Sequence, residues 1–179
     1  MRKIILIGGD LASGKSTYSK ILGQKFNIAV INKDILKEIL GDNILLKTRE
    51  ENKKLSIISF EMIKYILDST KENIIVECNF KDYEMEELKK YLVNNDILSI
   101  KVQGENEVLH KRFLKRLEGP RHYVHRSQDL SNIDDFIRVE NELRSVSYIG
   151  EVINVKICKD KFLIDDNELL NRIECFLRK

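Results

Sequence analysis

The stretch IILIGGDLASGKST, residues 4–17, decides the fold of this chain. Its first part, residues 4–7, is wholly apolar, as in a buried strand, and the rest is mostly glycine and small polar residues with one lysine. Residues 9–16, GDLASGKS, match the pattern G-x-x-x-x-G-K-[ST] at every fixed position. In that pattern a strand leads into a loop whose backbone N–H groups point inward, and a helix follows. The stretch therefore predicts a phosphate-binding loop between a first strand and a first helix.

The fixed residues of this loop have separate expected roles. Gly9 and Gly14 allow a tight backbone turn, and the helix that follows adds the positive end of its dipole. Lys15 is expected to reach the β- and γ-phosphates of a nucleotide, and the Ser16 hydroxyl is expected to bind Mg²⁺. The alternative is a glycine-rich turn that carries a surface lysine. The expected nucleotide contacts are Gly9, Leu11, Ala12, Ser13, Gly14, Lys15, Ser16 and Thr17.

Composition and net charge limit the number of domains and the kinds of partner that we expect for this chain. The chain has 179 residues, 42% of them hydrophobic, which suffices for one packed domain and leaves little room for a second. A net charge of +2 gives no general attraction to nucleic acid or to an anionic membrane. The three cysteines have no metal-type spacing, their odd number argues against a disulfide framework, and no apolar run is as long as a membrane span. We expect one cytoplasmic domain over residues 1–179, with no membrane partner.

Short apolar runs alternate with amphipathic ones along most of the chain. Runs rich in isoleucine and valine predict buried strands at residues 3–8, 27–32, 73–79, 97–103 and 151–157. Leucine and isoleucine at helical spacing predict helices at residues 15–26, 34–40, 55–69, 82–95, 105–118 and 167–179. Strands that alternate with helices are typical of parallel crossover units. We therefore predict an α/β fold of three layers with a mostly parallel, five-stranded sheet.

A basic segment follows the fifth of these helices. Residues 119–132, opened by Pro120, show no periodicity, and a loop of that length in a compact domain is usually functional or disordered. We expect a lid there that brings guanidinium groups over a bound triphosphate, because arginine binds phosphate oxygens through two N–H groups. The alternative is a solvated basic face. The histidines of this segment are expected to make hydrogen bonds rather than bind metal. Arg121 and Arg126 lie in this segment, and Arg112 and Arg116, four residues apart, share a face of the helix before it.

Two carboxylates stand at the expected ends of strands, where parallel sheets bind their ligands. Asp34 follows the second strand and could accept the proton of an attacking hydroxyl group and hold water near Mg²⁺. Its alternative role is the N-cap of the helix that follows. Glu77 ends the third strand, which lies beside the first in a typical P-loop order, and could orient Mg²⁺-bound water or bind the acceptor. The alternative is that Glu77 is only a polar residue at the end of a strand.

With these residues placed, the chain resembles the small P-loop kinases of the polynucleotide kinase, gluconate kinase, chloramphenicol phosphotransferase and zeta-toxin type over nearly its whole length. Their D-x-x-R element, whose aspartate is the base, is matched by Asp34 with Lys37 in place of the arginine. Their D-T-N element is matched in type by Glu77 and Asn79, with Cys78 in place of the threonine. The resemblance implies a P-loop NTPase fold of the nucleoside-kinase kind with a lid.

The lid pattern of these kinases, spaced arginines followed by Arg-His, is also present. In such kinases a helix arginine packs on adenine and lid arginines hold phosphates, which implies nucleotide contacts by Arg112 and Arg116. The catalytic residues expected are Lys15, Asp34, Arg116 and Arg121. The acceptor contacts expected are Asp34, Lys37, Glu77, Asn79 and Arg126.

The leading hypothesis is an ATP- and Mg²⁺-dependent kinase that transfers the γ-phosphoryl group to a hydroxyl of a small-molecule or nucleoside-like acceptor. A GTPase is not expected, because the NKD at residues 32–34 lacks the spacer of N-K-x-D and lies on the second strand. One alternative is a polynucleotide 5′-hydroxyl kinase, although no aromatic residues interleave with the basic segment as a stacking platform. The other alternative is a nucleotide-binding regulatory or toxin-like protein. Acceptor identity and oligomeric state cannot be read from the sequence.

Overall fold

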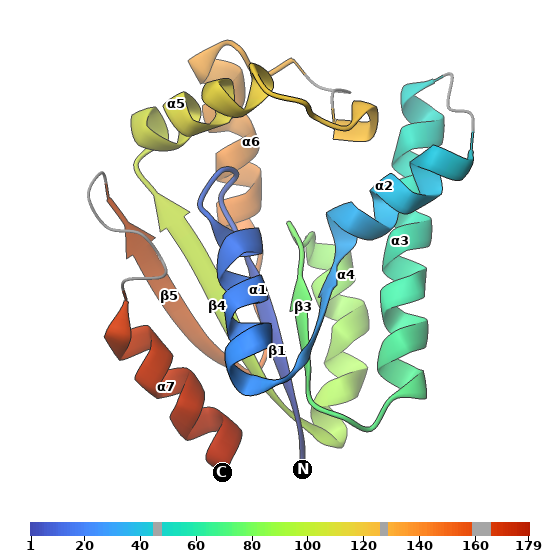
Figure 1. The fold of residues 1–179 in the computed structure, drawn as a ribbon, viewed down its shortest axis with the longest axis vertical. Helices are drawn as coiled ribbons and strands as arrows, with labels where there is room; N and C mark the ends of the chain where they lie inside the picture. The colour runs from blue at the N-terminus through green and yellow to red at the C-terminus, as the bar shows by residue number, and fades with distance from the viewer. Residues whose placement is uncertain (45–47, 126–128, 159–165) are drawn as a thin grey trace.

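The fold is a parallel sheet covered by helices on both faces (Figure 1). The computed structural model describes residues 1–44, 48–125, 129–158 and 166–179. All strand pairs are parallel, and the strand order is β2-β3-β1-β4-β5. The strands are β1 (Arg2–Gly9), β2 (Ala29–Asn32), β3 (Ile74–Glu77), β4 (Asn95–Gly104) and β5 (Glu151–Ile157). The predicted three-layer α/β fold with a five-stranded sheet is confirmed.

The described residues form seven α-helices and two short 3₁₀ helices. Within the described ranges, none of the helices is both long enough and apolar enough to cross a membrane. The α-helices are α1 (Lys15–Phe26), α2 (Lys33–Asn43), α3 (Arg49–Ser69), α4 (Asp82–Leu88), α5 (Asn106–Leu117), α6 (Ile133–Ser145) and α7 (Asn167–Arg178). The 3₁₀ helices are η1 (Lys89–Val93) and η2 (Tyr123–His125).

Strand β1 lies at the centre of the sheet and is buried on both faces. Because side chains alternate along a strand, Ile5 and Ile7 join one apolar cluster, which includes residues of α1 and α7. Ile4 and Leu6 join a second cluster, which includes residues of α3 and α4. This two-sided burial explains why the first run of the sequence is continuously apolar rather than alternating.

Three elements differ from the sequence-based expectation. No element was predicted for residues 133–145, where the structure has α6. Helix α3 begins at Arg49, ahead of the predicted residue 55, because Thr48 and Glu51 form a reciprocal capping box at its start. The helix predicted over residues 82–95 is split, since α4 ends at Leu88 and η1 continues as a 3₁₀ helix.

The first half of the predicted lid, residues 119–125, rests on α2 and α3. Val124 is buried, and its carbonyl oxygen accepts hydrogen bonds from Lys37 Nζ at 3.3 Å and from Asn52 Nδ2 at 2.9 Å. An added Cβ at Gly41 would lie 2.5 Å from a Val124 methyl group, so a glycine at this position of α2 allows the close approach. This part of the segment is therefore packed against the body of the protein.

Two glycines of the stretch that decides the fold differ in their surroundings. Gly9 has a φ of 117°, and an added Cβ would lie 2.0 Å from the carbonyl oxygen of Val102 on β4. Gly14 has a φ of 90°, yet an added Cβ would meet nothing within 4 Å. The first position therefore requires glycine for both conformation and space, and the second for conformation alone.

We expect Gly9→Ala to lower the free energy of unfolding by about 2–5 kcal/mol, since a strained backbone and a collision with β4 add together. Gly14→Ala is the matched control and should cost about 1–2 kcal/mol, the conformational part alone. Urea denaturation of both variants without ligand measures the difference. Equal losses would contradict the packing argument.

Candidate active site

The loop that joins β1 to α1, residues 9–16, is here called the glycine-rich loop. Gly14, in a left-handed conformation, is the N-cap of α1, and no side chain caps this helix. No acidic residue lies in its first turn either, whereas side chains cap α2, α3, α6 and α7. The first N–H groups of α1 therefore have no side-chain acceptor, and with the helix dipole they could accept an anion.

Lys15 lies folded over the glycine-rich loop. Its side chain is buried, and Nζ donates to the Asp10 carbonyl oxygen at 2.5 Å and to Ser13 Oγ at 3.3 Å. Burial lowers the pKa of this ammonium group, while the carboxylates of Glu77 and Glu140 act in the opposite direction. An anion in the loop would stabilise the charged form of Lys15 further.

Glu77 lies across the loop from Lys15, at the end of β3. Its partner in the sheet register is Ile7 of β1, so β3 delivers the carboxylate beside the glycine-rich loop. The Asn32 side-chain amide donates to Glu77 Oε2. Burial raises the pKa of Glu77, Lys15 lowers it and Asp34 raises it. Glu77 is thus a buried carboxylate whose charge depends on nearby cations.

Asp34 stands in the first turn of α2 and is exposed. The alternative reading of Asp34 as the N-cap of this helix is wrong. The cap is Asn32, whose Oδ1 accepts a hydrogen bond from the Ile35 N–H group at 3.0 Å. The carboxylate of Asp34 is therefore not needed to cap α2.

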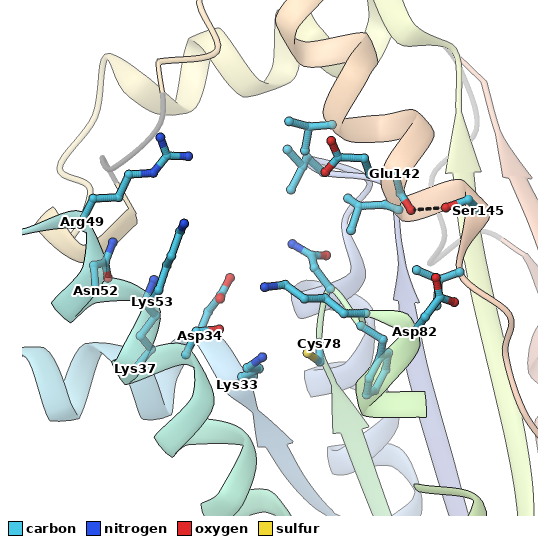
Figure 2. Close-up of a pocket in the computed structure, with 18 residues that line it drawn as sticks. Lys33, Asp34, Lys37, Arg49, Asn52, Lys53, Cys78, Asp82, Glu142 and Ser145 are labelled. Carbon is cyan, nitrogen blue, oxygen red and sulfur yellow. Dashed lines mark hydrogen bonds between the residues drawn. The ribbon is translucent and has the colours of Figure 1, made fainter. Parts of the chain in front are cut away.

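Two cavities meet at Asp34. The first, the loop cavity, has a volume of about 610 Å³ and lies between the glycine-rich loop and residues 116–125. The second, the side cavity, has a volume of about 560 Å³ and is lined by residues of α2, α3, α6 and the chain after β3 (Figure 2). The residues that line both are Leu11, Asp34, Lys37 and Asn79.

Most of the predicted site residues line the loop cavity. Ser13 is buried beneath the loop, where its Oγ donates to the Asp10 carbonyl oxygen at 2.7 Å. Arg112 lies one turn before Arg116 on α5 and does not line the cavity. Gly9, Gly14 and Thr17 do not line it either, and Arg126 lies outside the described residues. The predicted residues that line it are Leu11, Ala12, Lys15, Ser16, Asp34, Lys37, Glu77, Asn79, Arg116 and Arg121.

The two histidines of this cavity contact carboxylates of α2. His122 Nε2 lies 2.9 Å from Asp42 Oδ1, and His125 Nε2 lies 2.8 Å from Glu38 Oε1. Between them in sequence lies Val124, whose carbonyl oxygen accepts hydrogen bonds from Lys37 of α2 and Asn52 of α3. The expectation that they make hydrogen bonds is confirmed.

A Mg²⁺ ion fits the donors at the end of the glycine-rich loop. Ser16 offers a hydroxyl, and Glu77 and Asp34 offer carboxylate oxygens, which are the hard ligands that Mg²⁺ prefers. Within the described ranges, no group of three or more histidine, cysteine, aspartate and glutamate side chains could hold a metal ion.

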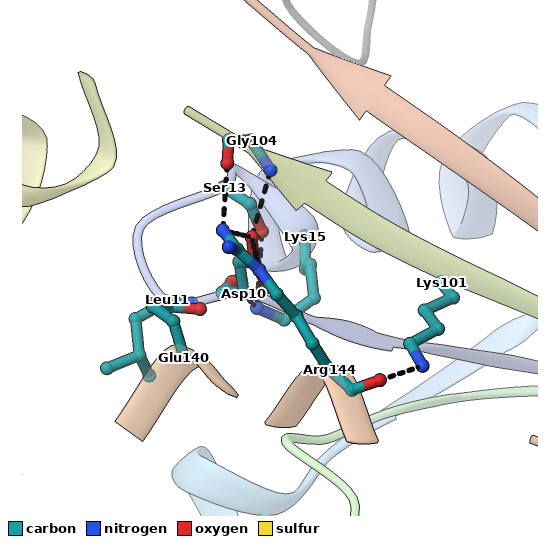
Figure 3. A network of polar contacts seen from close by, with 8 residues as sticks. All are labelled: Asp10, Leu11, Ser13, Lys15, Lys101, Gly104, Glu140 and Arg144. Atoms are coloured by element: carbon teal, nitrogen blue, oxygen red, sulfur yellow. Dashed lines mark hydrogen bonds and ion pairs between the residues drawn. The ribbon is translucent and has the colours of Figure 1, made fainter. Parts of the chain in front are cut away.

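The sequence analysis missed a buried network behind the loop (Figure 3). The Asp10 side chain is fully buried, and Arg144 of α6 contacts it through Nε at 3.0 Å and through Nη2 at 2.6 Å. The N–H group of Gly104, at the end of β4, donates to the same carboxylate at 2.9 Å. Asp10 occupies a variable position of the motif, so the motif gave no signal for it.

Glu140 of α6 belongs to the same network. It is fully buried and Oε1 accepts the Leu11 N–H group at 2.8 Å, while Oε2 has no hydrogen-bond partner in the part of the chain that the structure describes. Burial, followed by the charge of Asp10, raises the pKa of Glu140 to about 8. A protonated Glu140 can donate to the Asp10 carboxylate, which satisfies the second oxygen.

Comparison with solved structures gives several likenesses over almost the full chain. A candidate kinase from Chloroflexus aurantiacus J-10-fl is 21% identical with a TM-score of 0.75, covering 99% of this chain and 97% of that one. A gluconokinase from Sinorhizobium meliloti 1021 is 18% identical with a TM-score of 0.60, covering 99% and 98%. A shikimate kinase from Bacteroides thetaiotaomicron is 17% identical with a TM-score of 0.60, covering 98% of each chain.

These likenesses establish the fold. The chain shares the three-layer α/β fold of these solved kinases, as the sequence resemblance implied. No protein-family model matches the chain, and no curated protein matches it significantly.

We expect Arg144→Met to lower the free energy of unfolding by about 3–5 kcal/mol, because it leaves the Asp10 carboxylate buried without its cation. Adding Asp10→Asn should recover part of that loss, since the neutral amide no longer needs the cation. Urea denaturation of the single and double variants measures this. Additive losses would show that the two side chains do not stabilise each other.

A second prediction concerns the pH dependence that Glu140 confers. Its folded pKa of about 8 lies above the unfolded value, so its contribution to stability is complete below about pH 4.3 and is lost as pH rises toward 8. Glutamine can accept from Leu11 N–H and donate to Asp10 at any pH. Glu140→Gln should therefore become more stable than wild type by a few kcal/mol over this range. A difference that stays constant from pH 5 to 9 would refute the raised pKa.

Proposed function

We propose that the protein is an ATP- and Mg²⁺-dependent kinase that transfers the γ-phosphoryl group to a hydroxyl of a small-molecule acceptor. The observation that carries the proposal is that Asp34 lines two adjoining cavities, one of which contains the glycine-rich loop. A nucleotide in the loop cavity and an acceptor in the side cavity would meet at this carboxylate. The kinases among the structural neighbours support the same reaction class.

Binding and charge stabilisation fall to the residues around the loop. Backbone N–H groups of the loop and Lys15 would hold the phosphates, and Arg116 and Arg121 would cover them from the opposite side. Burial lowers the pKa of Arg116, the nearby Arg112 lowers it further, and Glu77 opposes this. Added phosphate charge would offset that repulsion between the arginines.

Mg²⁺, when bound, supplies positive charge to the transferring phosphoryl group. In this proposal the Ser16 hydroxyl is its protein ligand and Glu77 holds its waters. Asp34 accepts the proton of the acceptor hydroxyl, a role that suits an exposed carboxylate between both cavities. Asn79 and Lys37, which line both cavities, would orient the acceptor.

The side cavity favours a small aliphatic acceptor over a nucleoside or a nucleic-acid strand. Phe80 is the only aromatic residue among the described side chains that line it, and Phe80 is itself almost fully buried. A base or a strand would require exposed aromatic faces for stacking. A regulatory nucleotide-binding protein would need no second cavity at Asp34, and it would bind ATP without transferring phosphate.

At saturating Mg²⁺ we expect Asp34→Asn to keep Mg-ATP affinity and to reduce phosphoryl transfer by about 10²–10⁴-fold, the usual contribution of a positioned base. The test measures ATP binding by calorimetry and transfer from labelled ATP to a panel of hydroxyl compounds that includes a 5′-hydroxyl oligonucleotide. Lys15→Met is the reference for lost ATP binding.

Asp134→Asn is the matched control, because Asp134 also lies in the first turn of a helix and lines neither cavity. Full activity in Asp34→Asn would remove the base from the proposal. Wild-type ATP binding without transfer to any compound would favour the regulatory alternative, and preference for the oligonucleotide would favour the polynucleotide kinase.

A further inference from the structure

The side cavity has walls of opposite charge. Figure 2 shows Arg49 and Lys53 on one side of the cavity and Asp82 and Glu142 on the other, with Asp34 between them. A cavity whose charges are separated in this way orients a ligand that has unlike ends.

The positive charges of Arg49 and Lys53 are not balanced by any contact with the residues that the structure describes. The two residues are four positions apart on α3 and share a face of that helix. Neither makes an ion pair or a hydrogen bond with the residues that the structure describes. Both lie near the start of α3, where the helix dipole disfavours positive charge. The stability of the helix therefore does not account for them.

Other lysines also line the cavity, among them Lys37 on α2 and Lys81, which directly precedes Asp82. Burial lowers the pKa of Lys37; the charge of Asp34 opposes this, and Lys33 and Lys81 add smaller lowering effects. The ammonium of Lys33 already forms an ion pair with the buried Glu84, so Lys37 and Lys81 are better able to bind an anion in the cavity. An anion bound here would relieve the repulsion among these groups.

The carboxylates of Asp82 and Glu142, on the opposite side of the cavity, are not arranged to bind a cation together. Asp82 already accepts the Ser147 N–H group at 3.1 Å, and Glu142 lies exposed at the rim. These oxygens can still accept hydrogen bonds from the hydroxyl groups of a ligand. The cavity thus suits a polyhydroxyl compound with one anionic end.

We propose that the acceptor carries a carboxylate or phosphate group, which binds to Arg49 and Lys53, while its reactive hydroxyl faces Asp34. This inference rests on the proposed function, because it names the class of acceptor for the same reaction. Arginine binds either anion through two N–H groups, so both sources of negative charge fit the cavity.

The test uses four compounds that share a six-carbon frame: glucose, gluconate, glucose 6-phosphate and glucosamine. Binding is measured by calorimetry on protein loaded with Mg²⁺ and a non-hydrolysable ATP analogue, so that the glycine-rich loop cannot be the anion site. Gluconate or glucose 6-phosphate, or both, should bind, and which of them binds distinguishes carboxylate from phosphate. Glucose and glucosamine should bind at least about tenfold more weakly.

The double variant Arg49→Met/Lys53→Met should weaken anion binding by about 10- to 100-fold and leave affinity for the ATP analogue unchanged. Lys54→Met is the control, because Lys54 is exposed on the same helix and lines neither cavity. An equal loss in Lys54→Met, tighter binding of glucose or glucosamine, or no binding of either anion would overturn the inference.

Transfer from labelled ATP to the same compounds separates this inference from the proposed function. Anion binding that depends on Arg49 and Lys53, without transfer, would support the anion site and refute the kinase. Transfer to glucose or glucosamine alone would support the kinase and refute an anionic acceptor.

Discussion

The buried carboxylate of Asp10 holds together three parts of the chain that are distant in sequence. It accepts hydrogen bonds from the end of β4 at Gly104 and from Arg144 on α6, and it stands at the start of the glycine-rich loop. Glu140, one turn before Arg144, holds the next N–H group of the loop. The shape of the loop thus depends on a helix that lies more than a hundred residues later in the chain.

Much of the fold follows from local sequence signals. The strand and the loop at residues 4–17 could be predicted because each motif position has a conformational reason, such as the left-handed Gly9 and Gly14. The positions of Asp34 and Glu77 could be predicted as well, since parallel strands end at one edge of the sheet and β2, β3 and β1 are neighbours. These are the parts of the site that depend on strand order and little else.

The rest of the site depends on tertiary contacts that leave no local signal. Helix α6 has apolar residues at helical spacing, but Glu140 lies in the same stripe, and a carboxylate at that place suggests a solvated face. The cap of α2 is Asn32 rather than Asp34, a shift of two residues that only the backbone geometry decides. Likewise, the charge separation in the side cavity needs α3 and α6 to face each other, which no stretch of sequence specifies.

The contacts between α2 and the segment at residues 119–125 give the molecule a mechanical linkage. His122 and His125 bind carboxylates of α2, and the Val124 carbonyl binds Lys37, while Asp34 lies in the first turn of that same helix. Displacing the segment therefore breaks contacts with the helix that carries the proposed base. If the two substrates of the proposed reaction occupy these two cavities, both would act on this one set of contacts, and their binding free energies would not be additive.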